Sequence, residues 1–409
     1  MSGKTSIAVL GGGSWGTALA HLLAHAGHSV ALLLRDTAQA AHINAYHENP
    51  RYLRGVPLHP GIRAVAGDTG GPEQAEVLAG VSILVLSVPC QAMRGTLRRL
   101  AGVVPPDCVL VNTAKGIEVS ELVTVERMVR EELPGFVDRY AVLSGPSFAL
   151  EVATCKPTAV VLGCRDERLG ARLREVFATP WFRSYSSTDV PGVELGGAIK
   201  NVIAIAAGLS DGLGFGLNAR AALVTRGLAE TSRLGVALGA RASTFMGLSG
   251  LGDLMLTCSG DLSRNRQVGL RLGSGESLED IASSMCMVAE GVKTTQAVHR
   301  LAQRLGVDMP VTGTMYSVLY EGFAPLLLCG GVNAVNIIFY YVLAIMRKQK
   351  YMTILYLIVC GVALIIMDPI TGRLGLNGAA LGYLILVVLL GVLLMGYILY
   401  QIRKDRKRQ

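Results

Sequence analysis

The feature that most constrains the fold is a glycine-rich turn between two apolar runs near the N-terminus. Residues 6–36 read SIAVLGGGSWGTALAHLLAHAGHSVALLLRD. The apolar run at 7–10 predicts a buried strand, the spacing of apolar residues after the turn predicts a helix, and the run at 30–34 predicts a second strand. Strand, helix and strand in this order are typical of a parallel α/β sheet.

Within the turn, Gly11, Gly13 and Gly16 form the pattern G-x-G-x-x-G. In dinucleotide-binding folds, the first glycine permits the tight turn and the second lets the backbone approach a pyrophosphate. The third lets the helix lie close to the strand. A helix that begins near Ser14 would direct free backbone N–H groups at the phosphates. A glycine loop without a ligand is the alternative, but the flanking strands favour a dinucleotide site.

The residues after the second apolar run bear on the choice of cofactor. At this point an acidic residue usually binds the ribose 2′-hydroxyl, whereas an arginine nearby accommodates a 2′-phosphate. This chain has Arg35 followed by Asp36. The sequence therefore predicts NAD or NADP as the cofactor and does not separate the two.

Further buried-type runs follow at 81–89, 108–118 and 140–152. In open α/β sheets, ligands bind beyond the carboxyl ends of the strands. Ser87, Lys115 and residues 144–147 would lie there. We interpret Lys115 as functional, with a solvated loop lysine as the alternative. Residues 1–190 are thus predicted to form a Rossmann-type NAD(P)-binding domain.

From residue 191 the composition changes to small and apolar residues at helical spacing, which predicts an all-α domain over 191–325. Lys200 lies inside one such helix, between the apolar pairs 198–199 and 202–203 and beside Asn201. Such surroundings lower the pKa of an ammonium group, and a lysine with a lowered pKa transfers protons near neutrality. We therefore assign Lys200 to catalysis; a surface lysine with a buried stem is the alternative.

A second polar cluster lies in GLSGLGDLMLTCSGDLSRNRQVG, residues 247–269. If Asp253 starts a helical turn, Thr257 shares its face. Ser263 is predicted to be the N-cap of the next helix, with Arg264 and Asn265 in its first turn. A cation, an amide and free N–H groups at one helix start favour a phosphate site. The alternative is that Arg264 only caps a surface turn.

Charge and cysteine usage exclude several classes of protein. The formal net charge is +8, but residues 323–409 hold nine Lys and Arg and two Asp and Glu, so the part before them is nearly neutral. This gives little support to nucleic-acid binding. The eight cysteines form no CxxC pair and the seven histidines no ligand pattern, so we expect a reducing compartment and no metal site. The N-terminus lacks the apolar core of a secretory signal, so we expect a cytoplasmic catalytic part.

The last part of the chain is different in kind. Three long apolar stretches occupy 326–346, 352–367 and 378–400, and the last reaches the length that crosses a bilayer. We expect residues 326–409 to form two or three transmembrane-type helices with a basic C-terminal tail. Membrane contact through residues 326–400 is expected if this segment belongs to the protein.

The distribution of basic residues along the tail conflicts with a simple membrane anchor of three spanning helices. Basic residues at 347–350 and 403–408 should both stay cytoplasmic. If all three stretches crossed the membrane, the first 325 residues would lie outside the cell, away from NAD(P)H. Two interpretations remain. In the first, a two-helix hairpin holds the enzyme at the inner face of the membrane. In the second, which we favour, the tail is a fragment of another protein, joined by natural fusion, by engineering or by an error in sequence assembly, and it contributes nothing to catalysis.

Over residues 5–325 the chain resembles the bacterial NAD(P)-dependent sn-glycerol-3-phosphate dehydrogenases. The matching segments, in order, are GGGSWGTALA, NTAKGIE, SGPSFA, LGGAIKNVIAIAAGLSDGLGFGLNARAAL, TRGLAE, GLGDLMLTC, SRNR and VAEGVKT. The resemblance implies reversible hydride transfer between NAD(P)H and the ketone of dihydroxyacetone phosphate, giving sn-glycerol 3-phosphate for phospholipid synthesis. The resemblance is also compatible with a homodimer. The end of the chain, with LGLNGAALGYLI, is more weakly similar to the end of polysaccharide flippases.

The resemblance also implies roles for individual residues. Lys200 corresponds to the proton donor and acceptor, and we group Lys115 and Asp253 with it as catalytic. Residues corresponding to cofactor contacts are Ser14, Trp15, Arg35, Ala149, Val288 and Glu290, beside Gly11, Gly13 and Gly16. Lys115 and Arg264 correspond to positions that touch both ligands. The substrate positions are Gly145, Ser147, Asp253, Ser263 and Asn265, to which we add Lys200 and Thr257.

Two other functions stay open at this stage. One is a different hydroxyacid-type dehydrogenase, such as a relative of ketopantoate reductase, which SRNR after GLGD disfavours. The other is a membrane-anchored nucleotide-sensing or transport-related fusion protein. The presence of Lys200 together with Asp253 favours turnover over sensing.

Overall fold

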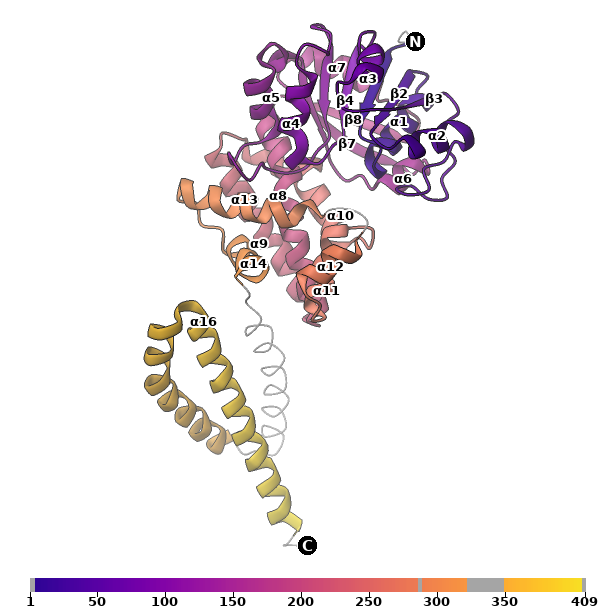
Figure 1. Ribbon diagram of the computed structural model, residues 1–409. Helices are drawn as coiled ribbons and strands as arrows, with labels where there is room; N and C mark the ends of the chain where they lie inside the picture. Colours follow the sequence, from indigo (N-terminus) through magenta and orange to yellow (C-terminus); the bar gives the residue numbers. More distant parts are fainter. Residues whose placement is uncertain (1–3, 286–288, 322–348, 407–409) are drawn as a thin grey trace. The chain divides into compact units, whose positions relative to one another are not determined.

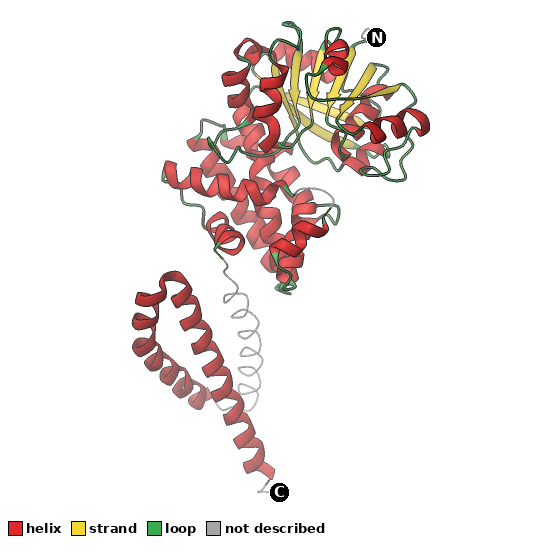
Figure 2. Ribbon diagram, in the orientation of Figure 1, coloured by secondary structure: helices red, strands yellow, loops and turns green. Residues whose placement is uncertain are grey.

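The structure, a computed structural model, describes residues 4–285, 289–321 and 349–406. It divides into two compact units, Met1–Met315 and Tyr316–Gln409. The predicted α/β sheet followed by an all-helical part is confirmed within the first unit (Figures 1 and 2).

An eight-stranded sheet forms the centre of the first part, in the order β3-β2-β1-β4-β5-β6-β7-β8. All neighbours pair in parallel except β6 and β7. The strands are β1 (Ser6–Leu10), β2 (Ser29–Leu34), β3 (Ile62–Ala66), β4 (Ile83–Leu86), β5 (Val109–Asn112), β6 (Tyr140–Ser144), β7 (Thr158–Cys164) and β8 (Phe182–Ser187). The strand order reverses between β1 and β4, which is where such sheets bind ligands.

Helices cover both faces of the sheet (Figure 2). Alternate residues of β1 show why its sequence is continuously apolar: Ile7 and Val9 pack on the side of α1, whereas Ala8 and Leu10 pack on the side of α4. Strands buried on both faces require such runs. The helices of this part are α1 (Ser14–His25), α2 (Thr37–Tyr46), α3 (Pro72–Leu78), α4 (Cys90–Leu100), α5 (Val125–Glu132), η1 (Pro134–Arg139), α6 (Ala149–Ala153) and α7 (Glu167–Val176).

The helical part is built around α8 (Val190–Gly212), which is almost entirely buried. Its other elements are α9 (Gly216–Ala237), η2 (Ala242–Met246), η3 (Leu248–Gly252), α10 (Asp253–Ser259), α11 (Arg264–Gly273), α12 (Leu278–Ser284), α13 (Glu290–Leu305) and α14 (Pro310–Tyr320). Small residues let α8 and α11 touch along their backbones. A Cβ on Gly208 would lie 2.0 Å from the carbonyl oxygen of Arg266, and one on Gly269 would lie 1.9 Å from that of Ile205.

The predicted limits at residues 190 and 325 stay predictions. In the structure, the last strand of the sheet ends at Ser187, Asp189 caps α8, and the division into compact units falls at Met315.

The second unit contains α16 (Gln349–Arg406), with Pro369 inside it. The apolar stretches 352–367 and 378–400 both lie in this helical element, which turns back on itself (Figure 1). Its two halves meet where Leu355 and Val359 pack with Leu390 and Leu394. These apolar side chains give the turned helix its own small core. The first predicted stretch, 326–346, lies outside the described residues.

By length and composition, two helices among the described residues are apolar enough to cross a membrane. One is α8, whose apolar window is fully buried in the first unit, so its apolar character is that of a core helix. The other is Leu381–Tyr400, with a mean hydropathy of 2.6 and only 33% of the window buried. The shorter apolar helix Ile354–Ala363 precedes it.

Candidate functional site

The glycine-rich turn has the geometry of a dinucleotide cradle. Gly11 has a φ of 122°, and a Cβ there would lie 2.4 Å from the carbonyl oxygen of Ser87. A Cβ on Gly16 would lie 2.0 Å from the carbonyl oxygen of Gly11, whereas one on Gly13 would meet only open space. The first and third glycines are therefore required by close packing, and the second leaves room at the N-terminus of α1. These residues fit a pyrophosphate group.

Residues that sequence reasoning missed hold this turn in place. The carbonyl oxygen of Gly12 accepts hydrogen bonds from the side-chain amides of Asn49 (3.0 Å) and Gln39 (2.6 Å). The hydroxyl of Ser14 donates to the carbonyl oxygen of Tyr52 (2.6 Å). Asn49 is fully buried. Its position 32 residues after Thr17, which it also contacts, gives no local sequence signal.

The end of β2 presents Arg35 to solvent. The next residue, Asp36, caps α2 by accepting from the backbone N–H of Gln39 (3.0 Å), and it pairs with Arg51 at 3.5 Å. The carboxylate that would otherwise bind ribose hydroxyls is thus engaged in a helix cap. Among the other predicted cofactor residues, Trp15 and Ala149 are half-buried against the core around α1, and Val288 lies outside the described residues.

Two lysines share one buried carboxylate at the junction of the sheet and the helical part. Asp253 is fully buried at the start of α10. Its Oδ2 accepts from Nζ of Lys115 at 2.7 Å, and its Oδ1 accepts from Nζ of Lys200. Lys200 also donates to the hydroxyl of Thr257 (2.8 Å), which lies one turn along α10 as the spacing predicts. The structure therefore brings together residues from α8, α10 and the loop after β5.

The electrostatics of this group follow from its burial. Burial lowers the pKa of Lys200 from 10.5 to about 7; Asp253 opposes this change and the charge of Lys115 adds to it. Burial is also the largest influence on Asp253 and would raise its pKa, but the two lysines together lower it below its usual value. The net charge of the three groups is +1 when Lys200 is protonated and zero when it is neutral. Near neutral pH, both protonation states of Lys200 are accessible.

The end of β6 completes one side of this group. Gly145 has a φ of 139°, and its carbonyl oxygen accepts from Nζ of Lys115 (3.1 Å) and from the hydroxyl of Ser147 (2.9 Å). Gly11, Arg35, Ser87, Lys115 and Gly145 each follow a strand of the parallel set, so they lie at the same edge of the sheet. The glycine turn and the lysine pair therefore belong to one edge.

The N-terminus of α11 carries the third predicted group. Ser263 is the N-cap, as predicted, and accepts from the backbone N–H of Arg266 (3.2 Å). Asn265 donates to the side chain of Asn201 (2.9 Å) and accepts from the backbone N–H of Gly291 (3.0 Å). Arg264 is exposed. The amide of Asn265 thus links α11 with α8 and α13, which sequence spacing does not reveal.

Two further contacts tie α13 and α8 to the sheet. Burial raises the pKa of Glu290, partly offset by the backbone N–H of Cys90, which donates to its Oε1 at 3.0 Å, and by the charge of Arg264. Asn201 donates to the carbonyl oxygen of Lys115 (3.2 Å). Glu290 therefore places a buried carboxyl group at the N-terminus of α4, and the cation of Arg264 lies near enough to this carboxyl group to influence its pKa.

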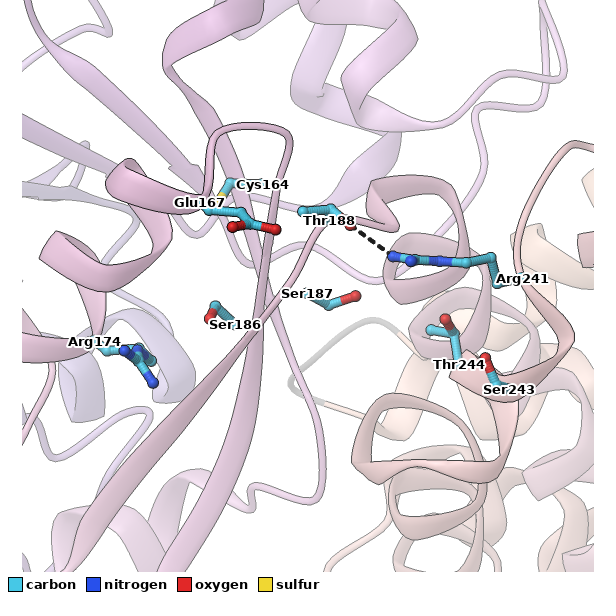
Figure 3. A pocket seen from close by; sticks show the side chains of 9 residues that line it. All are labelled: Cys164, Glu167, Arg174, Ser186, Ser187, Thr188, Arg241, Ser243 and Thr244. Carbon is cyan, nitrogen blue, oxygen red and sulfur yellow. Dashed lines mark hydrogen bonds between the residues drawn. The ribbon is translucent and has the colours of Figure 1, made fainter.

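A separate cavity of about 580 Å³ contains none of the predicted site residues (Figure 3). Its lining comes from β7, α7, the end of β8 and η2, and Arg241 spans its rim by donating to the hydroxyl of Thr188 (2.7 Å). The lysine pair does not line it. Across the described ranges, no group of three or more His, Cys, Asp or Glu residues could hold a metal ion.

Comparison with known proteins agrees with this architecture. The family model for the N-terminus of NAD-dependent glycerol-3-phosphate dehydrogenase matches residues 6–170, and the model for its C-terminus matches 189–328. A glycerol-3-phosphate dehydrogenase [NAD(P)+] of Lawsonia intracellularis is 63% identical over 327 residues, 80% of this chain and 92% of the relative. One from Nitratidesulfovibrio vulgaris (strain DP4) is 65% identical over 319 residues, 78% of this chain and 95% of the relative.

A solved structure shows the same fold. The crystal structure of glycerol-3-phosphate dehydrogenase from Coxiella burnetii is 37% identical, with a TM-score of 0.73, and covers 78% of this chain and 95% of its own. Sequence and fold agree over the same four-fifths of the chain. The chain therefore belongs to the NAD-dependent glycerol-3-phosphate dehydrogenase family.

Proposed function

We propose that the chain interconverts dihydroxyacetone phosphate and sn-glycerol 3-phosphate with NAD(P)H, supplying a precursor of glycerophospholipids. The observation that carries this proposal is the pair of lysines that share Asp253 at the sheet edge of the glycine turn. A carbonyl placed there would meet a proton donor and a fixed positive charge. Both are needed when a ketone is reduced to an alcohol.

Lys200 is the proposed proton donor in reduction and the acceptor in oxidation. Because burial brings its pKa to about 7, both protonation states are populated near neutrality. Asp253 and Thr257 hold its Nζ in one direction, so the ammonium is oriented before the substrate arrives. Lys115, fixed by Asp253 and Gly145, would stabilise the developing alkoxide.

The substrate phosphate is proposed to bind at the start of α11. Arg264 supplies the charge, and the first N–H groups of a helix favour an anion. Ser263 and Asn265 fix this helix start through the cap and through the contact of Asn265 with Asn201. Gly145 and Ser147 border the other side of the lysine pair.

The cofactor is proposed to lie along the turn of Gly11, Gly13 and Gly16, with Ser14, Trp15, Ala149, Val288 and Glu290 around it. When bound, the reduced nicotinamide would supply the hydride. Arg35 is exposed beside a carboxylate that is engaged in capping α2, which suits a 2′-phosphate without excluding NAD. The cofactor is therefore NAD or NADP.

The test is oxidation of NAD(P)H by the purified full chain in mild detergent, with dihydroxyacetone phosphate as the substrate. We expect turnover with this ketone and formation of sn-glycerol 3-phosphate. Ketopantoate serves as the control substrate for the alternative hydroxyacid-type dehydrogenase. Cofactor binding without turnover of either ketone would favour a nucleotide-sensing fusion protein and contradict the proposal.

For the C-terminal segment, we propose that the apolar surface of Leu381–Tyr400 contacts a lipid bilayer; in the alternative to the joined fragment, a two-helix hairpin holds the cytoplasmic catalytic part at the inner face of the membrane. The support is the high hydropathy of this helix and its low burial. A joined fragment, similar to the end of a flippase, is the origin that we favour. Carbonate extraction of membranes and protease access to the catalytic part test the attachment; release of the full chain by carbonate would contradict it.

A homodimer is a further proposal, tested by light scattering in detergent.

A further inference from the structure

The first third of α8 carries a buried carboxyl group that the proposed reaction does not use. Glu194 lies six residues before Lys200 and is 6% exposed. Its Oε1 accepts hydrogen bonds from the backbone N–H of Glu126 (3.0 Å) and from the hydroxyl of Tyr140. One carboxyl group therefore ties α8 to two elements of the nucleotide-binding part, α5 and β6.

The bond to Glu126 replaces a missing helix cap. The N-cap of α5, Thr124, makes no side-chain capping hydrogen bond, and Glu126 is the second residue of the helix. A backbone N–H at this position has no partner within its own helix. Glu194 supplies the acceptor that an N-cap side chain supplies in most helices. The start of α5 and the first part of α8 are thereby fixed against each other.

Glu194 is the first of three residues on one face of α8 that meet the nucleotide-binding part. Gly197 follows at i+3, where a Cβ would lie 2.6 Å from the hydroxyl of Ser144. Asn201 follows at i+7 and donates to the carbonyl oxygen of Lys115. Residues at this spacing share a helix face, so this face of α8 meets α5, both ends of β6 and the loop after β5.

Lys200 is the immediate neighbour of the last contact on this face. At 1.5 Å per residue, it lies about 9 Å along the helix axis from Glu194. A small shift or rotation of α8 at Glu194 would therefore move the Lys200 ammonium relative to Asp253 and Lys115, which the sheet edge and α10 hold separately.

The chemistry of Glu194 favours a positional role over simple packing. Burial raises its pKa to about 7, the hydrogen bond from Tyr140 opposes this, and the nearby carboxylate of Glu126 adds to it. Glu126 is in turn paired with Arg165 at 2.6 Å. An apolar side chain would avoid the cost of burying a carboxyl group. An apolar side chain could not, however, fix the position and orientation of α8 as two directional hydrogen bonds do.

We propose that Glu194 is a positioning residue. It fixes how α8 packs against α5 and β6, and the position of α8 in turn fixes the Lys200 ammonium relative to the reacting carbonyl. This inference rests on the proposed function, because its readout is turnover of dihydroxyacetone phosphate. It adds a residue to which neither the sequence pattern nor the glycine turn points.

The experiment compares Glu194→Ala, Glu194→Gln and Tyr140→Phe with wild type, using the full chain in detergent. The matched control is Ser210→Ala, because Ser210 is buried in the same helix and its hydroxyl has no hydrogen-bond partner in the described part of the chain. Each protein is measured for kcat, for the dissociation constant of NADPH by fluorescence, and for melting temperature.

A displacement of about 1 Å can cost on the order of 100-fold in rate, so we expect Glu194→Ala to lower kcat by about 30-fold with NADPH affinity within about twofold of wild type. Glu194→Gln retains an oxygen that accepts both hydrogen bonds, so its kcat should stay within about threefold of wild type, and Tyr140→Phe should lose about fivefold. Ser210→Ala should match wild type.

Several results would overturn the positioning role. One is a kcat for Glu194→Ala and Tyr140→Phe equal to that of the control. Another is a Gln variant as impaired as the Ala variant, with parallel losses of NADPH affinity and melting temperature, which would make Glu194 a structural residue only. If Glu194→Ala does not fold, Tyr140→Phe decides, because it removes one hydrogen bond without removing the carboxyl group. A wild-type chain without turnover would instead contradict the proposed function.

Discussion

Replacing Asp253 by Asn tests the electrostatic core of the site. The substitution preserves the size of the side chain but removes the single negative charge between Lys115 and Lys200. Lys200 is 7% exposed and already has a pKa near 7 because it is buried. The negative charge of Asp253 stabilises the protonated form of Lys200. Without this charge, we expect the pKa of Lys200 to fall further.

The size of the fall can be worked from the geometry. At an effective dielectric constant of about 20, two unit charges about 4 Å apart interact by about 4 kcal/mol, equal to about 3 pKa units. Relaxation of the site offsets part of this. We therefore expect the pKa of Lys200 in Asp253→Asn to drop by about 1–2 units.

The assay is the pH dependence of kcat/KM for reduction of dihydroxyacetone phosphate. Reduction needs protonated Lys200, so activity is present below its pKa and is lost as pH rises through it. The loss should centre near pH 7 in wild type and at a lower pH in Asp253→Asn. For oxidation of glycerol 3-phosphate the sign reverses, since the neutral amine is the active form.

The matched control is Asp261→Asn, because the side chain of Asp261 is 91% exposed and pairs with Arg266, outside the lysine pair. Its pH profile should equal that of wild type. An unchanged alkaline limb in Asp253→Asn would refute the electrostatic reasoning, because it would show that Lys200 does not supply the proton or does not interact with this carboxylate.

Three other substitutions test separate parts of the argument. Lys200→Ala should abolish turnover while leaving NADPH affinity, measured by titration calorimetry, nearly intact. Loss of both turnover and NADPH affinity would show that the role of the residue is structural. Asn49→Ala should weaken NADPH binding by about 1 kcal/mol, since the half-buried carbonyl of Gly12 loses one hydrogen bond and keeps that of Gln39, and an unchanged dissociation constant would contradict this role. Gly208→Ala should destabilise the first unit by about 1–3 kcal/mol, because its Cβ would meet the carbonyl of Arg266, and a melting temperature equal to that of wild type would contradict the packing.

Local pattern was enough for five of the eight strands (β1, β2, β4, β5 and β6) and for the helices that carry the site, α1, α8, α10 and α11. The apolar run of β1 and the glycines after it predict the strand, the turn and the start of α1, because each depends on residues within a few positions. The N-cap at Ser263 and the shared face of Asp253 and Thr257 are of the same kind. In the tail, the two apolar runs lie in one helical element whose halves pack together, and this packing is not contained in the pattern of either run.

By itself, the sequence determined the dinucleotide turn, the buried character of Lys200 and the change of composition near residue 191, since all three follow from neighbours along the chain. Only the tertiary structure decided that Lys115 and Asp253, 138 residues apart, meet at one carboxylate, that Asn49 holds the carbonyl of Gly12, and that Glu194 caps α5. The reason is physical. Helix and strand periodicity fix which face a residue shows, whereas the partner on that face depends on how closely whole elements approach each other.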